Sequence, residues 1–337
     1  MKREKMSTLL LSGAMAVMMT MPAETQSQDT SRAATALHEL RAERQAAQGI
    51  AKGNATEQDA GEDERLTLRE RIQSRRNAKS QKSSGESVTL GGREVSIWAP
   101  TATGPAPLVL FSHGFGGCPT QSKFLTQALA DNGYLVIAPK HADANCGGGE
   151  RGKPKESFRE PSSWTDATYR DRRDDVSSVF EALRVDPGWK IRIDWDKVGL
   201  MGHSLGGYTV LGLGGGWASW RLNGVKAILA LSPVCQPFVE NGTLQSLTSP
   251  LSFQGGTRDV GITPGVKRPG GCYDKASSPA QFVEFQDAGH FAWTDRQTAS
   301  SDNIVFYAQS FFDSSLRGLN PGSLREKRAG VSELRWK

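Results

Sequence analysis

The residues best suited to chemistry lie in the stretch Lys197–Gly207, which contains the pattern Gly-x-Ser-x-Gly around Ser204. A serine hydroxyl is a weak nucleophile, so it must be exposed where a general base can reach it. A sharp turn between a strand and a helix exposes it in that way. An apolar run before the motif and a helical pattern over Tyr208–Leu213 predict such a turn. Gly202 and Gly206 lack the Cβ atoms that would collide there. The alternative is a glycine-rich turn whose serine only caps a helix.

A serine nucleophile of this kind needs a histidine that follows it in the chain. Of the five histidines, only His290 comes after Ser204. It lies just past an apolar strand, in a loop of the kind where catalytic residues gather in open α/β sheets. We therefore expect His290 to be the general base, the alternative being an ordinary histidine of a surface loop.

The acid that orients the histidine should lie between these two residues. Asp259 follows an apolar strand and a loop of small residues, which places it at the same edge of the sheet as Ser204 and His290. Asp287 stands only three residues before His290 and is expected to order its own loop. Asp259 is the favoured acid, the alternative being a turn residue that caps the next helix. The acidic residues weighed are Glu240, Asp259, Asp274, Glu284 and Asp287.

A tetrahedral oxyanion needs two backbone N–H donors. One is expected from Leu205, which follows the nucleophile at a helix N-terminus. The other is expected from Phe115 in the glycine-rich loop His113–Gly117, which follows an apolar strand. The alternative for that loop is a simple tight turn.

Elements that could position these residues alternate along the chain. Two strands joined by Gly91-Gly92 predict a hairpin, and continuous apolar runs predict strands that are buried on both faces. Apolar residues at helical spacing predict helices between them. The alternation indicates an α/β fold with a doubly wound, mostly parallel sheet. Predicted strands cover residues 87–90, 93–98, 107–112, 134–138, 225–231, 251–254 and 281–285, besides the run before Ser204, and predicted helices cover 120–132, 169–185, 208–213 and 302–312.

These residues resemble the α/β-hydrolases. The resemblance is narrowest to the group that holds dienelactone hydrolases, platelet-activating-factor acetylhydrolases, chlorophyllases and cutinase-like polyester hydrolases. It covers about residues 87–316 and implies ester hydrolysis by a triad of Ser204, Asp259 and His290. The motifs that carry it are Phe111–Gly117, Asp131–Pro139, Arg172–Val176, Val198–Gly207, Gly255–Asp259 and Ala288–Phe291.

The 337 residues allow one large domain with appendages. Residues 1–23 read as a signal peptide, with a basic start and an apolar stretch too short to span a bilayer. Residues 24–86 have few large apolar side chains and read as a flexible polar linker or propeptide. Residues 87–316 are expected to form the α/β-hydrolase domain, and residues 317–337 a charged tail without a core. The signal predicts a secreted or periplasmic protein.

Four cysteines in an exported chain predict two disulfides. Cys118 and Cys146 follow neighbouring strands, and Cys235 and Cys272 do the same, so these two pairings are expected. The alternative is four free thiols.

The sequence thus predicts a serine carboxylesterase that acts as a monomer on a small-molecule or lipid ester. Phospholipid acetyl esters and polyesters are alternative substrates, and a catalytically silent binding protein is the alternative of another class. No metal-binding spacing or nucleotide loop is found, so no cofactor is expected. The net charge of +5 is modest; it favours no nucleic-acid function and suits an anionic cell envelope. Trp164, Trp217 and Trp293 could line the substrate pocket or pack in the core.

Overall fold

A computed structural model describes residues 85–148, 152–296, 298–319 and 322–337. The predicted signal peptide, and the predicted linker except for its last two residues, lie outside the described residues. No helix in the described part of the chain combines the length and the apolar character that crossing a bilayer requires.

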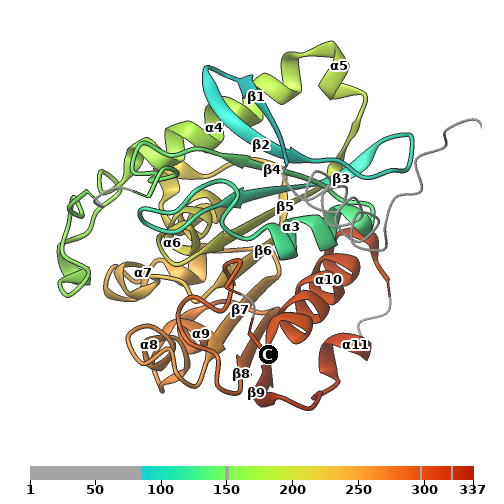
Figure 1. Cartoon of the computed structure of the whole chain (residues 1–337). Helices are drawn as coiled ribbons and strands as arrows, with labels where there is room; N and C mark the ends of the chain where they lie inside the picture. Colours follow the sequence, from blue (N-terminus) through green and yellow to red (C-terminus); the bar gives the residue numbers. More distant parts are fainter. Residues whose placement is uncertain (1–84, 149–151, 297, 320–321) are drawn as a thin grey trace, which may run out of the picture. The chain divides into compact units, whose positions relative to one another are not determined.

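The described chain forms a nine-stranded sheet in the order β1-β2-β4-β3-β5-β6-β7-β8-β9 (Figure 1). The pairs from β4 through β8 are parallel, and β1, β2 and β9 add antiparallel edges. The α/β-hydrolase fold is therefore confirmed. The strands are β1 Glu86–Leu90, β2 Arg93–Trp98, β3 Ala106–Ser112, β4 Leu135–Pro139, β5 Ile193–His203, β6 Val225–Leu231, β7 Leu251–Gly256, β8 Ala280–Phe285 and β9 Val331–Trp336.

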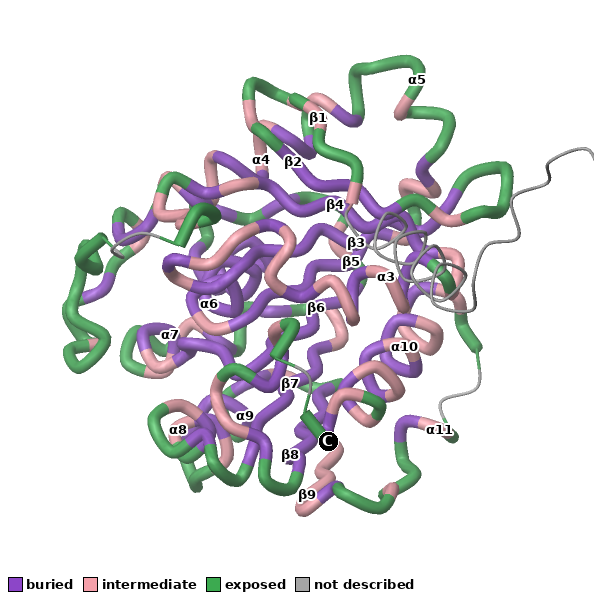
Figure 2. Tube along the Cα trace, viewed as in Figure 1, coloured by how far each residue is buried: buried purple, intermediate pink, exposed green. Residues whose placement is uncertain are grey.

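Helices cover both faces of this sheet because side chains alternate along each central strand. On β3, Leu108 and Leu110 pack in the same core as α4 and α6, whereas Val109 and Phe111 pack with α3 and α10. The central strands are accordingly buried along most of their length (Figure 2). The helices are α3 Lys123–Asp131, α4 Arg170–Val185, α5 Pro187–Lys190, α6 Leu205–Leu211, α7 Gln236–Glu240, α8 Thr263–Lys267, α9 Cys272–Lys275, α10 Ser301–Arg317 and α11 Gly322–Arg325. Shorter turns of 3₁₀ or π type span Pro161–Ser163, Gly212–Gly216, Ala218–Trp220 and Leu244–Ser246.

The prediction of a charged tail over residues 317–337 is wrong. Helix α10 continues to Arg317, and β9 pairs antiparallel with β8 at the edge of the sheet. Val331 is buried, and Leu334 and Trp336 pack against the core shared with α10. The charged residues between them lie on the other side of this edge strand. An edge strand that alternates in this way has too few apolar residues to be recognised by hydropathy.

Candidate active site

Ser204 forms the turn between β5 and α6, where its backbone has φ 56° and ψ −115°. The left-handed region costs a non-glycine residue about 1–3 kcal/mol, so the surroundings must hold it. The Ser204 N–H donates to the carbonyl of Leu231 at 3.0 Å, and the Ser204 carbonyl accepts from Val234 at 3.0 Å. Strand β6 and the loop after it thus fix the strained turn, with Ser204 lining a cleft.

The glycines on either side of Ser204 are required by close backbone contacts. A Cβ at Gly202 would lie 2.1 Å from the carbonyl oxygen of Gly206. A Cβ at Gly206 would lie 1.9 Å from the carbonyl oxygen of Ser112, at the end of β3. These distances are far below contact, so the turn admits only glycine at both positions.

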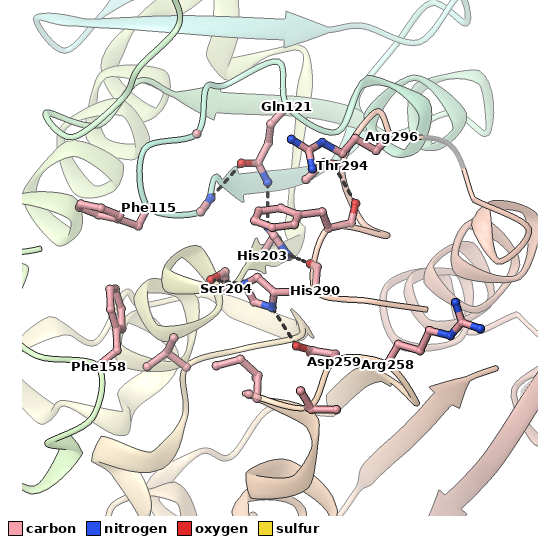
Figure 3. Close-up of a pocket in the computed structure, with 17 residues that line it drawn as sticks. Phe115, Gln121, Phe158, His203, Ser204, Arg258, Asp259, His290, Thr294 and Arg296 are labelled. Carbon is pink, nitrogen blue, oxygen red and sulfur yellow. Dashed lines mark hydrogen bonds and ion pairs between the residues drawn. The ribbon is translucent and has the colours of Figure 1, made fainter. Parts of the chain in front are cut away.

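A hydrogen-bonded chain joins Ser204, His290 and Asp259 (Figure 3). The Ser204 Oγ lies 2.9 Å from His290 Nε2, and His290 Nδ1 lies 3.1 Å from Asp259 Oδ1. Asp259 is buried, and burial opposes its ionisation. Hydrogen bonds from His290, Ser232 and Thr263 outweigh that effect and lower the pKa of Asp259. A carboxylate that stays ionised here keeps Nδ1 protonated and leaves Nε2 free to accept the serine proton.

Ser232 is a fourth member of this cluster that the sequence analysis missed. It follows β6 and has a positive φ of 43°. Its hydroxyl donates to Asp259 Oδ2 and lies 2.9 Å from His290 Nδ1. Ser232 therefore binds both the acid and the imidazole. Its position directly after a predicted strand was the available signal.

The loop His113–Gly117 lies against Ser204. A Cβ at Gly114 would be 3.4 Å from the Ser204 Cβ. In the described part of the chain, no hydrogen bond occupies the N–H of Phe115. The Leu205 N–H is at the first position of α6, where a helix provides no internal acceptor. Neither N–H group is thus bound to an acceptor among the described residues, as donors to an oxyanion would have to be.

The side chains of Arg172 and Asp143 bind the backbone of that loop. The buried Arg172 guanidinium donates to the carbonyls of His113 at 2.8 Å and Gly114 at 3.2 Å. It also pairs with Asp143 at 3.0 Å, and Asp143 accepts from the Gly116 N–H at 3.1 Å. Burial opposes ionisation of Asp143, but Arg172 overcomes it and lowers the pKa of that carboxyl. The pair therefore fixes the backbone on both sides of Phe115.

Gln121 and His203 link the same loop to His290. The Gly114 N–H donates to Gln121 Oε1 at 3.1 Å, and Gln121 Nε2 donates to His203 Nδ1 at 3.1 Å. His203 Nε2 lies 2.8 Å from the carbonyl of His290, which can only accept, so Nε2 carries the proton. Burial, with a smaller effect of His290, lowers the pKa of His203 to about 3. His203 is thus a neutral connector rather than a base.

A second hydrogen-bonded series of Ser, His and Asp side chains is buried next to the loop and does not line the cleft. The Ser112 Oγ donates to His141 Nε2 at 2.9 Å, and His141 Nδ1 lies 3.0 Å from Asp175 Oδ2. The three side chains are almost wholly buried, so no substrate can reach this serine. The His141 N–H donates to His113 Nε2, so the series supports the oxyanion loop.

The cleft over Ser204 has a volume of about 570 Å³ and mainly apolar walls. Phe115, Phe158 and Phe291 are among the side chains that line it. Figure 3 shows the first two. Trp217 and Trp293 are buried in the two cores and do not line the cleft, so their role is packing. Among the described residues, no group of His, Cys, Asp and Glu side chains is arranged to hold a metal ion.

Two disulfides pair Cys118 with Cys146 and Cys235 with Cys272, the pairs expected from the order of the strands. The first joins the end of the oxyanion loop to the segment after β4 that carries His141 and Asp143. The second joins the segment after β6 to α9. Disulfides are typical of proteins outside the cytoplasm.

The comparison with known families agrees with this geometry. The family model described as Chlorophyllase matches residues 74–254, more than half of the chain. The chain belongs to the chlorophyllase family. This membership confirms the resemblance drawn from the motifs and makes the protein a hydrolase of the α/β type that acts on esters. A search of curated proteins found no match.

The match to the chlorophyllase family ends before two of the three residues in the hydrogen-bonded chain. It includes Ser204 and the loop His113–Gly117, whereas Asp259 and His290 follow it. In this chlorophyllase-family protein, the assignment of Asp259 and His290 as partners of Ser204 therefore depends on their geometry and not on the family match. Asp287, the alternative acid, instead pairs at 3.1 Å with Arg258 in the loop after β7.

Proposed function

We propose that this protein is an exported serine carboxylesterase that forms an acyl-enzyme on Ser204. The observation that carries the proposal is the hydrogen-bonded chain from Ser204 through His290 to Asp259. Family membership supports ester hydrolysis in general. The two disulfides support export.

In the proposed reaction, His290 Nε2 takes the proton from Ser204 as its Oγ attacks the ester carbonyl. Asp259 stabilises the imidazolium that forms. The N–H groups of Phe115 and Leu205 bind the oxyanion, and each such donor typically lowers the barrier by about 3 kcal/mol. His290 then gives its proton to the leaving alcohol. Water, activated by the same imidazole, releases the acid and restores the serine.

Loss of Ser204 tests this mechanism. With 4-nitrophenyl butyrate as substrate, Ser204→Ala should lower kcat at least about ten-thousandfold, because the residual rate would come from binding and the oxyanion site alone. A fluorophosphonate probe should label the wild-type protein and not the variant. The measurement is nitrophenolate release together with mass spectrometry of the labelled peptide. Hydrolysis that survives Ser204→Ala would contradict the proposal.

The same probe separates the enzyme from a catalytically silent binding protein, because only an activated serine reacts with it. Short-chain carboxylic esters are the proposed substrates. A series of nitrophenyl esters from acetate to octanoate, with a phospholipid acetyl ester and a polyester film beside it, ranks the substrate classes.

A further inference from the structure

A second cavity adjoins the Ser204 cleft and shares a wall with it. This side cavity has a volume of about 300 Å³ and extends to Arg159 and Arg268. The side cavity therefore lies next to the cleft, on its Phe158 side. The residues that line both spaces are Phe158, Val234, Gly261 and Ile262.

The charges around the two spaces are almost all positive. The described residues that line them include one carboxylate, Asp259, which is already bound by His290, Ser232 and Thr263. They include four guanidinium groups. Arg258 pairs with Asp287, and Arg296 stacks on Phe291 at 5.0 Å. The other two, Arg159 and Arg268, are exposed, have no ion pair with any described residue, and both line the side cavity.

The direction of the side cavity matches the acyl half of an ester. His290 must hand its proton to the leaving oxygen, so the alcohol half lies on the His290 side of Ser204. Figure 3 shows Phe115 and Phe158 on the opposite side of Ser204 from His290. The acyl half therefore points toward Phe158, where the side cavity begins.

Resting on the proposed esterase function, we propose that the side cavity binds a carboxylate at the far end of the acyl chain. The preferred substrates are then half-esters of dicarboxylic acids. The apolar wall formed by Phe158, Val234 and Ile262 contacts the chain. Arg159 and Arg268 bind the terminal carboxylate, for which guanidinium has a matching two-pronged geometry.

The test compares two nitrophenyl esters that differ in the terminal group. One is the mono-4-nitrophenyl ester of glutaric acid, whose acyl chain ends in a carboxylate, and the other is neutral 4-nitrophenyl pentanoate. In the double variant Arg159→Gln/Arg268→Gln, the ratio of kcat/KM for glutarate over pentanoate should fall at least about tenfold. The fall should come from KM of the glutarate ester, because the guanidinium groups bind the substrate without touching the ester carbonyl.

A charge-matched control removes two other arginines, Arg192→Gln/Arg325→Gln. Arg192 directly precedes β5, at the end of the strand opposite Ser204, and Arg325 ends α11. This control should keep the wild-type ratio. A ratio unchanged in the Arg159/Arg268 variant, or one that falls equally in the control, would overturn the proposal.

The outcomes also separate this inference from the esterase function itself. In one outcome, the wild type hydrolyses the pentanoate ester and reacts with the fluorophosphonate, while the ratio of kcat/KM for glutarate over pentanoate stays the same in the Arg159→Gln/Arg268→Gln variant. In that outcome only the carboxylate subsite is refuted. If the wild type hydrolyses neither ester and is not labelled, the esterase proposal fails and the subsite fails with it.

Discussion

At the scale of single residues, two serines at the ends of neighbouring strands share an unusual backbone. Ser204 after β5 and Ser232 after β6 have φ values of 56° and 43°. Strained backbone of this kind persists where surrounding contacts hold it, and it gathers at functional sites. For Ser232, the result is a hydroxyl directed at both Asp259 and His290. Its place suggests that it keeps the acid ionised and the imidazole oriented.

Removing the Ser232 hydroxyl should slow the reaction without abolishing it. In Ser232→Ala, Asp259 keeps its bonds to His290 and Thr263 but loses one donor, so its pKa should rise toward its ordinary value. A hydrogen bond to a charged group is worth about 1.5–3 kcal/mol, so kcat for 4-nitrophenyl butyrate should fall about tenfold or more. The control is Ser252→Ala, another buried serine, whose hydroxyl donates to Gln281 at 2.8 Å away from the cleft. Equal kcat values for Ser232→Ala and Ser252→Ala would show that the Ser232 hydroxyl does not contribute to the reaction.

At the scale of elements, the oxyanion loop is held by α4 and by the segment after β4. Arg172 on α4 bonds two carbonyls of the loop, and Asp143 bonds the Gly116 N–H. The disulfide Cys118–Cys146 joins the end of the loop covalently to the segment after β4. The backbone around Phe115, the proposed oxyanion donor, therefore depends on a helix that begins far along the chain.

Two neighbouring arginines on α4 make a matched test of this role. Arg172 is buried, so Arg172→Gln leaves Asp143 without its partner and should lower the free energy of unfolding by about 3–5 kcal/mol. Arg173 is partly exposed and pairs with Asp174, so Arg173→Gln should cost about 1 kcal/mol or less. Urea unfolding measures both. At a temperature where both variants are folded, only Arg172→Gln should also lower kcat, and similar kcat values would show that the loop does not need Arg172.

Most of the fold and of the candidate site could be predicted from the sequence, because the strongest sequence signals are local. Apolar runs and helical spacing predicted the strands β1 to β8 and the helices α3, α4, α6 and α10, and the order of the motifs predicted the partners of Ser204. The short helices α5, α7, α8, α9 and α11 were not predicted. The contacts of Gln121, His203 and Arg172 could not be predicted, since they join side chains far apart in the chain through hydrogen bonds that leave no periodic pattern. Strand β9 was missed for a different reason, because its charged residues concealed an edge strand.

At the scale of the whole molecule, three buried histidines lie at the carboxyl ends of neighbouring parallel strands of the sheet. Burial lowers the pKa of His113, His141 and His203 below the ordinary value of 6.5. Each therefore stays neutral in the folded protein at a pH where the unfolded chain binds a proton. The unfolded state then binds more protons than the native state, so stability is complete above about pH 6.5 and is lost as the pH falls below it.

This linkage predicts a steep acid dependence of stability between pH 6.5 and pH 5. Each buried histidine can contribute about 1.4 kcal/mol per pH unit below the unfolded pKa, so three together approach about 4 kcal/mol per unit. Urea unfolding followed by tryptophan fluorescence at several pH values, with the disulfides intact, measures the slope. In His203→Gln the slope should fall by the share of one histidine, because the remaining two still titrate only in the unfolded chain. A wild-type stability that stays constant from pH 7.5 to pH 5 would mean that these histidines gain protons in the folded protein, and the neutral hydrogen-bond network assigned to them would then be wrong.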